Sequence, residues 1–200
     1  MLSLLTASVV LAGCGGGAAD QGSAAPSGSA ASSAAVETAK GATAEEGATE
    51  TAAFSANTDP DTADPSSGAS VTVRDIRLGR QDGFDRVVFE VGGTGTPGWD
   101  VRYVDAASSQ GSGKPIDVAG AAILQVSLTG AGYPYDTGVM EYSAAGPLTT
   151  GGTEAVTEVV FDATFEGTTT AFVGTKSRAP FRVYLMQNPT RVVLEVAHPS

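Results

Sequence analysis

Tyrosine side chains and a carboxylate gather in one Gly- and Pro-rich stretch of the sequence, at Tyr133, Tyr135, Asp136 and Tyr142. Aromatic rings can stack on sugars or peptides, and phenol and carboxylate groups can form hydrogen bonds with them. Loops on a rigid scaffold commonly carry such binding residues. We therefore expect these four residues to bind a ligand. The alternative is that the tyrosines cover the open end of a hydrophobic core.

Catalytic chemistry has little support in the sequence. The only histidine, His198, lies near the end of the chain, and the only cysteine is Cys14, so a histidine-based triad or a zinc site is not expected. The G-x-S-x-G and S-x-x-K motifs of hydrolases do not occur. We expect no enzyme activity, no cofactor and no metal.

Pairs of acidic residues keep one catalytic alternative open, because two carboxylates can hydrolyse glycosides. A small carboxylate-dependent hydrolase is therefore the less supported alternative. The Asp82 and Asp85 carboxylates could also hold Ca²⁺, but turn capping or pairing with arginine is the favoured role. The acidic pairs are Asp82 with Asp85, Asp100 with Asp105, and Asp136 with Glu141.

The elements that would position these residues are short β-strands. From residue 70 onward, apolar residues alternate with polar ones and turn signals recur every eight to twelve residues, while no helical period persists over three turns. This pattern predicts an all-β domain over residues 70–200, an antiparallel β-sandwich of eight or nine strands. A change of phase near Asp75 predicts a β-bulge. The expected strands cover residues 71–78, 86–91, 99–103, 115–118, 123–128, 155–165, 169–173, 181–186 and 191–197.

One short segment is repeated within the domain. Residues 85–91 read D-R-V-V-F-E-V and residues 190–196 read T-R-V-V-L-E-V. The echo suggests a pseudo-symmetric sandwich with equivalent strands in its two halves. Chance is an open alternative, because strands draw on few residue types.

The N-terminus carries the pattern of an exported lipoprotein. Residues 1–10 form an apolar run too short to span a bilayer, as in a signal peptide. It leads into Leu11-Ala12-Gly13-Cys14, which resembles the lipobox at which bacteria acylate the cysteine and cleave before it. Residues 1–14 are thus expected to be a lipoprotein signal peptide and lipobox, and two or more acyl chains on Cys14 would anchor the chain stably. No Lys or Arg precedes the apolar run, so we expect the true start codon to lie upstream.

Residues 15–69 are expected to be a disordered tether. They consist largely of Ala, Gly, Ser, Thr and acids, with Phe54 as the only aromatic residue, and such a composition cannot offset the entropy of folding by burial. The chain carries a net charge of −11 and has no basic cluster to gather phosphates, so no nucleic-acid partner is expected.

The strand residues also support a resemblance to a known family. The run from Asp82 to Glu90 (D-G-F-D-R-V-V-F-E), the Gly132-Tyr133-Pro134-Tyr135 segment and the closing strand from Pro189 to Val196 are similar to the AMIN-like domain of lipoproteins from high-GC bacteria. That group is related to the AMIN domain found beside cell-wall amidases and secretins. The resemblance implies a β-sandwich without catalysis that binds peptidoglycan or envelope partners.

Together these patterns predict a lipid-anchored, noncatalytic binding module on the outer leaflet of the cell membrane. The expected partners are the membrane, through the acyl chains on Cys14, and peptidoglycan or another wall glycan. A protein-protein adaptor in an envelope complex is the alternative. We expect the protein to be a monomer.

Overall fold

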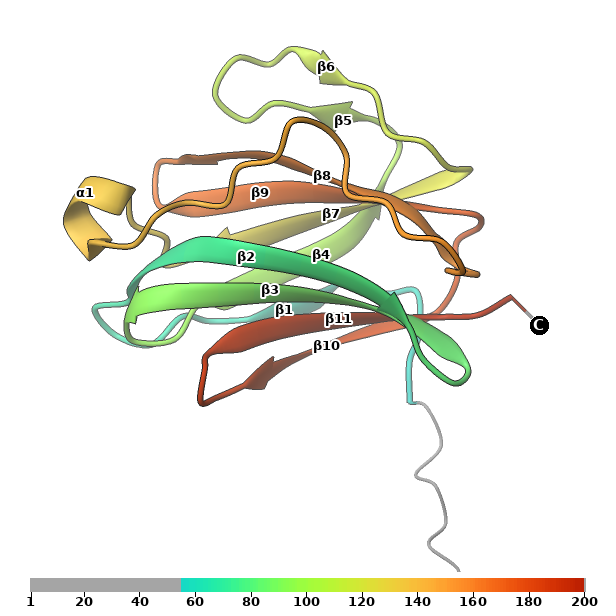
Figure 1. The fold of residues 1–200 in the computed structure, drawn as a ribbon, viewed down its shortest axis with the longest axis horizontal. Coiled ribbons are helices and arrows are strands. Elements are labelled where there is room, and N and C mark those ends of the chain that lie inside the picture. Colours follow the sequence, from blue (N-terminus) through green and yellow to red (C-terminus); the bar gives the residue numbers. More distant parts are fainter. Residues whose placement is uncertain (1–54, 200) are drawn as a thin grey trace, which may run out of the picture. The chain divides into compact units, whose positions relative to one another are not determined.

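Alternating apolar residues form strands at all nine expected places in residues 55–199, the part of the chain that the computed structural model describes (Figure 1). Two short strands that the sequence did not predict bring the number in this part to eleven. All paired strands are antiparallel, as expected for a sandwich. No helix among the described residues is long and apolar enough to cross a membrane.

The strands form two main sheets and one small hairpin. The four-stranded sheet has the order β10 (Phe181–Met186), β11 (Arg191–Ala197), β3 (Phe84–Thr94), β2 (Ser70–Arg80). The five-stranded sheet has the order β1 (Asp61–Ala63), β4 (Gly98–Val104), β7 (Ala122–Thr129), β9 (Thr168–Thr175), β8 (Val156–Phe165). The hairpin pairs β5 (Ala107–Ser108) with β6 (Pro115–Ile116), and one short helix, α1, spans Pro134–Thr137.

The hydrophobic core lies between the two main sheets. Val87 and Phe89 of β3 and Leu194 of β11 are buried in one cluster with residues of β4, β7 and β9. Since side chains alternate across a strand, Arg86 and Glu195 lie on the opposite, outer face of the four-stranded sheet. The bulge expected near Asp75 is confirmed, because the register with β3 shifts between Val73 and Asp75.

The repeated segments lie side by side in one sheet. Strand β3 pairs directly with β11, with Val88 opposite Val193 and Glu90 opposite Arg191 (Figure 1). The expectation of equivalent strands in two separate halves of the sandwich is therefore wrong. Antiparallel pairing instead places the Arg of each copy near the Glu of the other.

The two outer faces of the sandwich differ. The β5–β6 hairpin covers the five-stranded sheet, where the Gln110 amide donates to Asp162 Oδ2 at 3.1 Å and Thr170 Oγ1 donates to Gln110 Oε1 at 2.9 Å. Phe172 lies on that outer face and is only 1 % exposed. The four-stranded sheet has no such hairpin over its outer face in the part of the chain described (Figure 1).

Part of the expected tether belongs to the sandwich. Within residues 55–69, which we expected to be tether, β1 pairs with β4 and Asn57 pairs with Phe181 of β10. The Asp61 carboxylate joins the two sheets: Oδ1 accepts from Trp99 Nε1 at 2.9 Å and Oδ2 accepts from the Val183 amide at 3.0 Å. The sequence pattern did not predict this strand, because the strand is only three residues long and largely polar. The remainder of the expected tether, the signal peptide and Cys14 lie outside the described residues.

Candidate ligand-binding surfaces

A buried carboxylate with three partners stands at the centre of the outer face of the four-stranded sheet. Glu195 is fully buried, and its Oε1 accepts from Arg86 Nε at 2.8 Å, Arg86 Nη2 at 2.6 Å and the Tyr184 hydroxyl at 2.9 Å. Its Oε2 accepts from Arg182 Nε at 2.6 Å. The register explains the cluster, because Glu195 stands directly opposite Arg86 on β3 and Arg182 on β10. Such cross-strand pairs are the unit of sheet stabilisation.

The hydrogen bonds of this cluster favour an ionised Glu195 and a neutral Tyr184. Burial alone would raise the pKa of Glu195, but hydrogen bonds from Arg86, Arg182 and Tyr184 together outweigh burial and lower it. Burial and the bond to Glu195 raise the pKa of the Tyr184 hydroxyl, which therefore stays a neutral donor. Two arginines share the Glu195 carboxylate in this cluster.

A second carboxylate cluster lies next to the first. Glu90 of β3 accepts at Oε1 from Arg74 Nε at 2.8 Å and at Oε2 from Arg77 Nη2 at 2.8 Å. Hydrogen bonds from Arg77 and Arg74 lower the pKa of Glu90, with the larger effect on the pKa from Arg77. Arg77 also binds Asp75. We call this surface the arginine face; it comprises Arg74, Arg77, Arg86, Arg182, Glu90, Glu195, Phe84 and Tyr184.

Aromatic rings hold the guanidinium groups of the arginine face in place. The guanidinium carbon of Arg86 lies 5.4 Å from the Phe84 ring centroid, and that of Arg182 lies 6.0 Å from the same centroid and 5.8 Å from the Tyr184 ring. Cation–π contacts of this kind orient planar guanidinium groups at little entropic cost. The Arg86 and Arg182 side chains stay 34 % and 37 % exposed, so both can meet a ligand.

Two hollows flank the arginine face. A groove of about 540 Å³ at the β10 edge is lined by Ser55, Asp61, Arg182, Val183 and Tyr184. On the other side, a hollow of about 170 Å³ is lined by residues that include Arg77 and Arg86. An extended molecule crossing the strands from one hollow to the other would pass over the Glu195 cluster. In a chain of net charge −11, this row of arginines favours acidic groups on that molecule.

The structure brings together three of the four residues that the sequence predicted to bind a ligand. Tyr133, Tyr135 and Asp136 lie on or beside α1, and the rings of the two tyrosines stack with centroids 5.4 Å apart and planes 12° apart. Tyr135 is 80 % exposed. Tyr142 is partly buried against the core, and its ring meets Phe161 edge-on at 5.5 Å. The alternative of a tyrosine covering the core therefore describes Tyr142.

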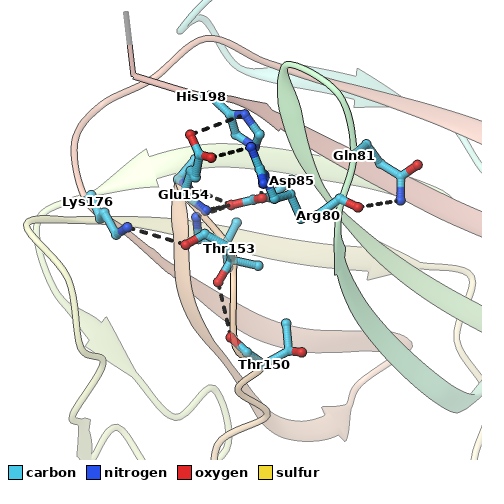
Figure 2. A network of polar contacts seen from close by, with 10 residues as sticks. Arg80, Gln81, Asp85, Thr150, Thr153, Glu154, Lys176 and His198 are labelled. Atoms are coloured by element: carbon cyan, nitrogen blue, oxygen red, sulfur yellow. Dashed lines mark hydrogen bonds and ion pairs between the residues drawn. The ribbon is translucent and has the colours of Figure 1, made fainter.

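A third polar network ties the two sheets together (Figure 2). Asp85 of β3 is fully buried, and its Oδ2 accepts from the amides of Glu154, Ala155 and Val156 at 2.8, 2.6 and 2.9 Å. Its Oδ1 lies 3.0 Å from His198 Nε2. These residues join the four-stranded sheet, the start of β8 and the C-terminal segment. With four partners on its two oxygens, Asp85 stabilises the folded structure.

Two of the three acidic pairs considered for catalysis, Asp82 with Asp85 and Asp100 with Asp105, are separated or bonded to other groups. Asp85 is buried in the network just described, whereas Asp82 is exposed. Asp100 pairs with Arg102, at 2.6 Å between Asp100 Oδ1 and Arg102 Nε. Among the residues the structure describes, no group of three or more His, Cys, Asp or Glu side chains could hold a metal ion.

Sequence reasoning missed the Glu195 cluster. The signal that could have revealed it is the repeated Arg-x-x-x-Glu spacing, at Arg86 and Glu90 and again at Arg191 and Glu195. In a strand this spacing places both charges on one face, and the hydrophobic residues between them place that face away from the core. Charged outward positions on two similar strands therefore indicate a shared polar face, once the strands are known to be neighbours.

Comparison with known proteins agrees with this fold. The sequence pattern of the AMIN-like domain matches residues 71–198. No curated protein and no solved structure matches the chain. AMIN-like domains are extracytoplasmic modules of the cell envelope. The match covers β2 to β11, with the arginine face and α1, and the chain therefore belongs to the AMIN-like domain family.

Proposed function

We propose that this protein is a noncatalytic binding module of the cell envelope that holds an acidic wall glycan, peptidoglycan first of all, on the arginine face. One observation carries the proposal. A buried glutamate fixes two arginines, each about one-third exposed, and a tyrosine on the outer face of the four-stranded sheet.

The energetics of the cluster favour a role in binding. A buried ion pair contributes little net stability, because desolvation of the charges offsets their attraction. The Glu195 cluster does, however, hold Arg86 and Arg182 in fixed positions before a ligand arrives. Carboxylates and sugar hydroxyls of peptidoglycan can accept hydrogen bonds from such preorganised guanidinium groups. The Phe84 and Tyr184 rings supply apolar area for sugar rings.

The wall-binding proposal is tested by co-sedimentation of the full chain with purified peptidoglycan sacculi. We expect the protein to pellet with the sacculi at low salt and to be released progressively as salt screens the guanidinium groups. A chain that stays in the supernatant at every salt concentration overturns the proposal.

Membrane anchoring completes the proposed function. Acylation of Cys14 would hold the chain on the outer leaflet, and the roughly 40 residues between Cys14 and the first described residues would span on the order of 35 Å as a random coil. We expect Cys14→Ala to move the protein from the membrane fraction to the soluble fraction of cells and to abolish incorporation of radiolabelled palmitate. Membrane recovery equal to that of wild type would show that Cys14 is not the anchor.

A further inference from the structure

The stacked tyrosines beside α1 form a second exposed surface with a chemistry opposite to that of the arginine face. Besides Tyr135, Met140 is 84 % exposed, and these two are the most exposed large hydrophobic side chains of the part described. Asp136 is exposed beside them. We call this surface the tyrosine platform; it comprises Tyr133, Tyr135, Asp136 and Met140.

The base of the tyrosine platform is held firmly. Thr137 Oγ1 lies 2.7 Å from Thr72 Oγ1, and the fully buried Thr72 also donates to the Gly132 carbonyl at 2.7 Å. A Cβ atom at Gly132 would stand 2.3 Å from Ser70 Oγ and 2.8 Å from Thr137 Cγ2, so a larger residue there would force these side chains to move. Gly138 ends the helix in the left-handed conformation, with its amide bonded to the Pro134 carbonyl. The two rings are therefore presented on a rigid support, which lowers the entropic cost of binding.

The negative charge of the tyrosine platform favours a positively charged partner. Residues 129–152 contain Asp136 and Glu141 but no Lys, Arg or His. A neutral phenol ring beside a carboxylate attracts a cation, through the ring face and through the acid. Tyr and Met are also enriched at protein interfaces, and exposed Met adapts to varied protein surfaces.

We propose that the tyrosine platform docks a basic segment of an envelope protein, with a Lys or Arg side chain over Tyr135 and paired with Asp136. The proposal does not depend on the wall-binding function, since the two surfaces carry opposite charge and share no residue.

Fluorescence anisotropy with the full chain in detergent tests this docking site. The probe is a labelled peptide of alternating arginine and glycine, and its counterpart carries neutral citrulline at each arginine. We expect the arginine peptide to bind more tightly than the citrulline peptide. Tyr135→Ala should weaken binding roughly fivefold, the worth of an exposed cation–π contact, and Tyr135→Phe should retain it. Asp136→Asn should weaken binding about threefold.

Matched controls separate this site from general attraction to an acidic chain. Asp117→Asn removes one exposed acid elsewhere and should leave peptide binding unchanged, as should a variant of the arginine face. Equal binding of the two peptides, or equal losses with Asp117→Asn and Asp136→Asn, would overturn the proposal. So would a Tyr135→Ala variant that binds the peptide normally but loses co-sedimentation with sacculi, because the platform would then be a glycan site.

Discussion

Asp85→Ala should lower the free energy of unfolding by roughly 3–5 kcal/mol, a large effect for a single substitution. The substitution leaves three amides at the start of β8 without their acceptor, at a site where Asp85 itself is fully buried (Figure 2). Hydrogen bonds to a charged acceptor are worth more than neutral ones, and buried donors left without a partner carry the full cost of desolvation. Urea unfolding followed by circular dichroism measures the change.

Two further variants test the cause of that loss. Asp82→Ala removes an exposed acid from the same hairpin and should change stability by no more than about 0.5 kcal/mol. His198→Ala removes the partner of Oδ1 and the 3.6 Å contact between His198 Nδ1 and Glu154 Oε2, and it should cost about 1 kcal/mol. If Asp85→Ala unfolds within about 1 kcal/mol of wild type, the network is not what joins the two sheets at this end.

Replacing the Glu195 cluster by apolar residues should abolish wall binding while the fold persists. The variant Arg86→Met/Arg182→Met/Glu195→Leu removes both guanidinium groups together with the carboxylate that would otherwise stay buried without partners. Removing a whole buried ion cluster in this way is often neutral for stability, whereas removing one partner is costly. We expect the affinity for sacculi to fall at least about tenfold, or 1.4 kcal/mol, with little change in the urea midpoint.

A matched variant on the other sheet controls for charge. Arg102→Met removes one positive charge, the same net change as the triple variant, from the outer face of the five-stranded sheet, where Arg102 pairs with Asp100. We expect Arg102→Met to bind sacculi like wild type. An equal loss of binding in the two variants would mean that overall charge, and not the arginine face, attracts the wall.

The strands could be predicted from the sequence because their hydrophobic residues alternate. Strand β7 is an example: Leu124, Val126 and Leu128 point into the core and the residues between them do not. Strand β1 could not be predicted in this way, because its three residues are positioned by pairing with β4 and by the side chain of Asp61, which are contacts between distant parts of the chain.

The two candidate sites also differ in whether they could be predicted from the sequence. Tyr133, Tyr135 and Asp136 were found because they are close in sequence, and the structure places them on or beside one short helix. Arg86 and Glu195 are 109 residues apart in sequence and meet only because β3 and β11 are neighbours. The sequence could suggest that Arg86 pairs with an acid, but it could not say which acid, since that choice depends on strand order and register.

Chemical amidation of the sacculi tests the central claim most directly, because it removes acid groups from the ligand and leaves the protein unchanged. Wild-type chain and the triple variant of the arginine face are sedimented with native sacculi and with sacculi whose carboxylates have been converted to amides. The arginine face predicts that wild type pellets with native sacculi and is largely lost from amidated ones, while the triple variant binds neither. Wild-type binding that survives amidation, or triple-variant binding to native sacculi at the wild-type level, would contradict the assignment of this face to an acidic wall glycan.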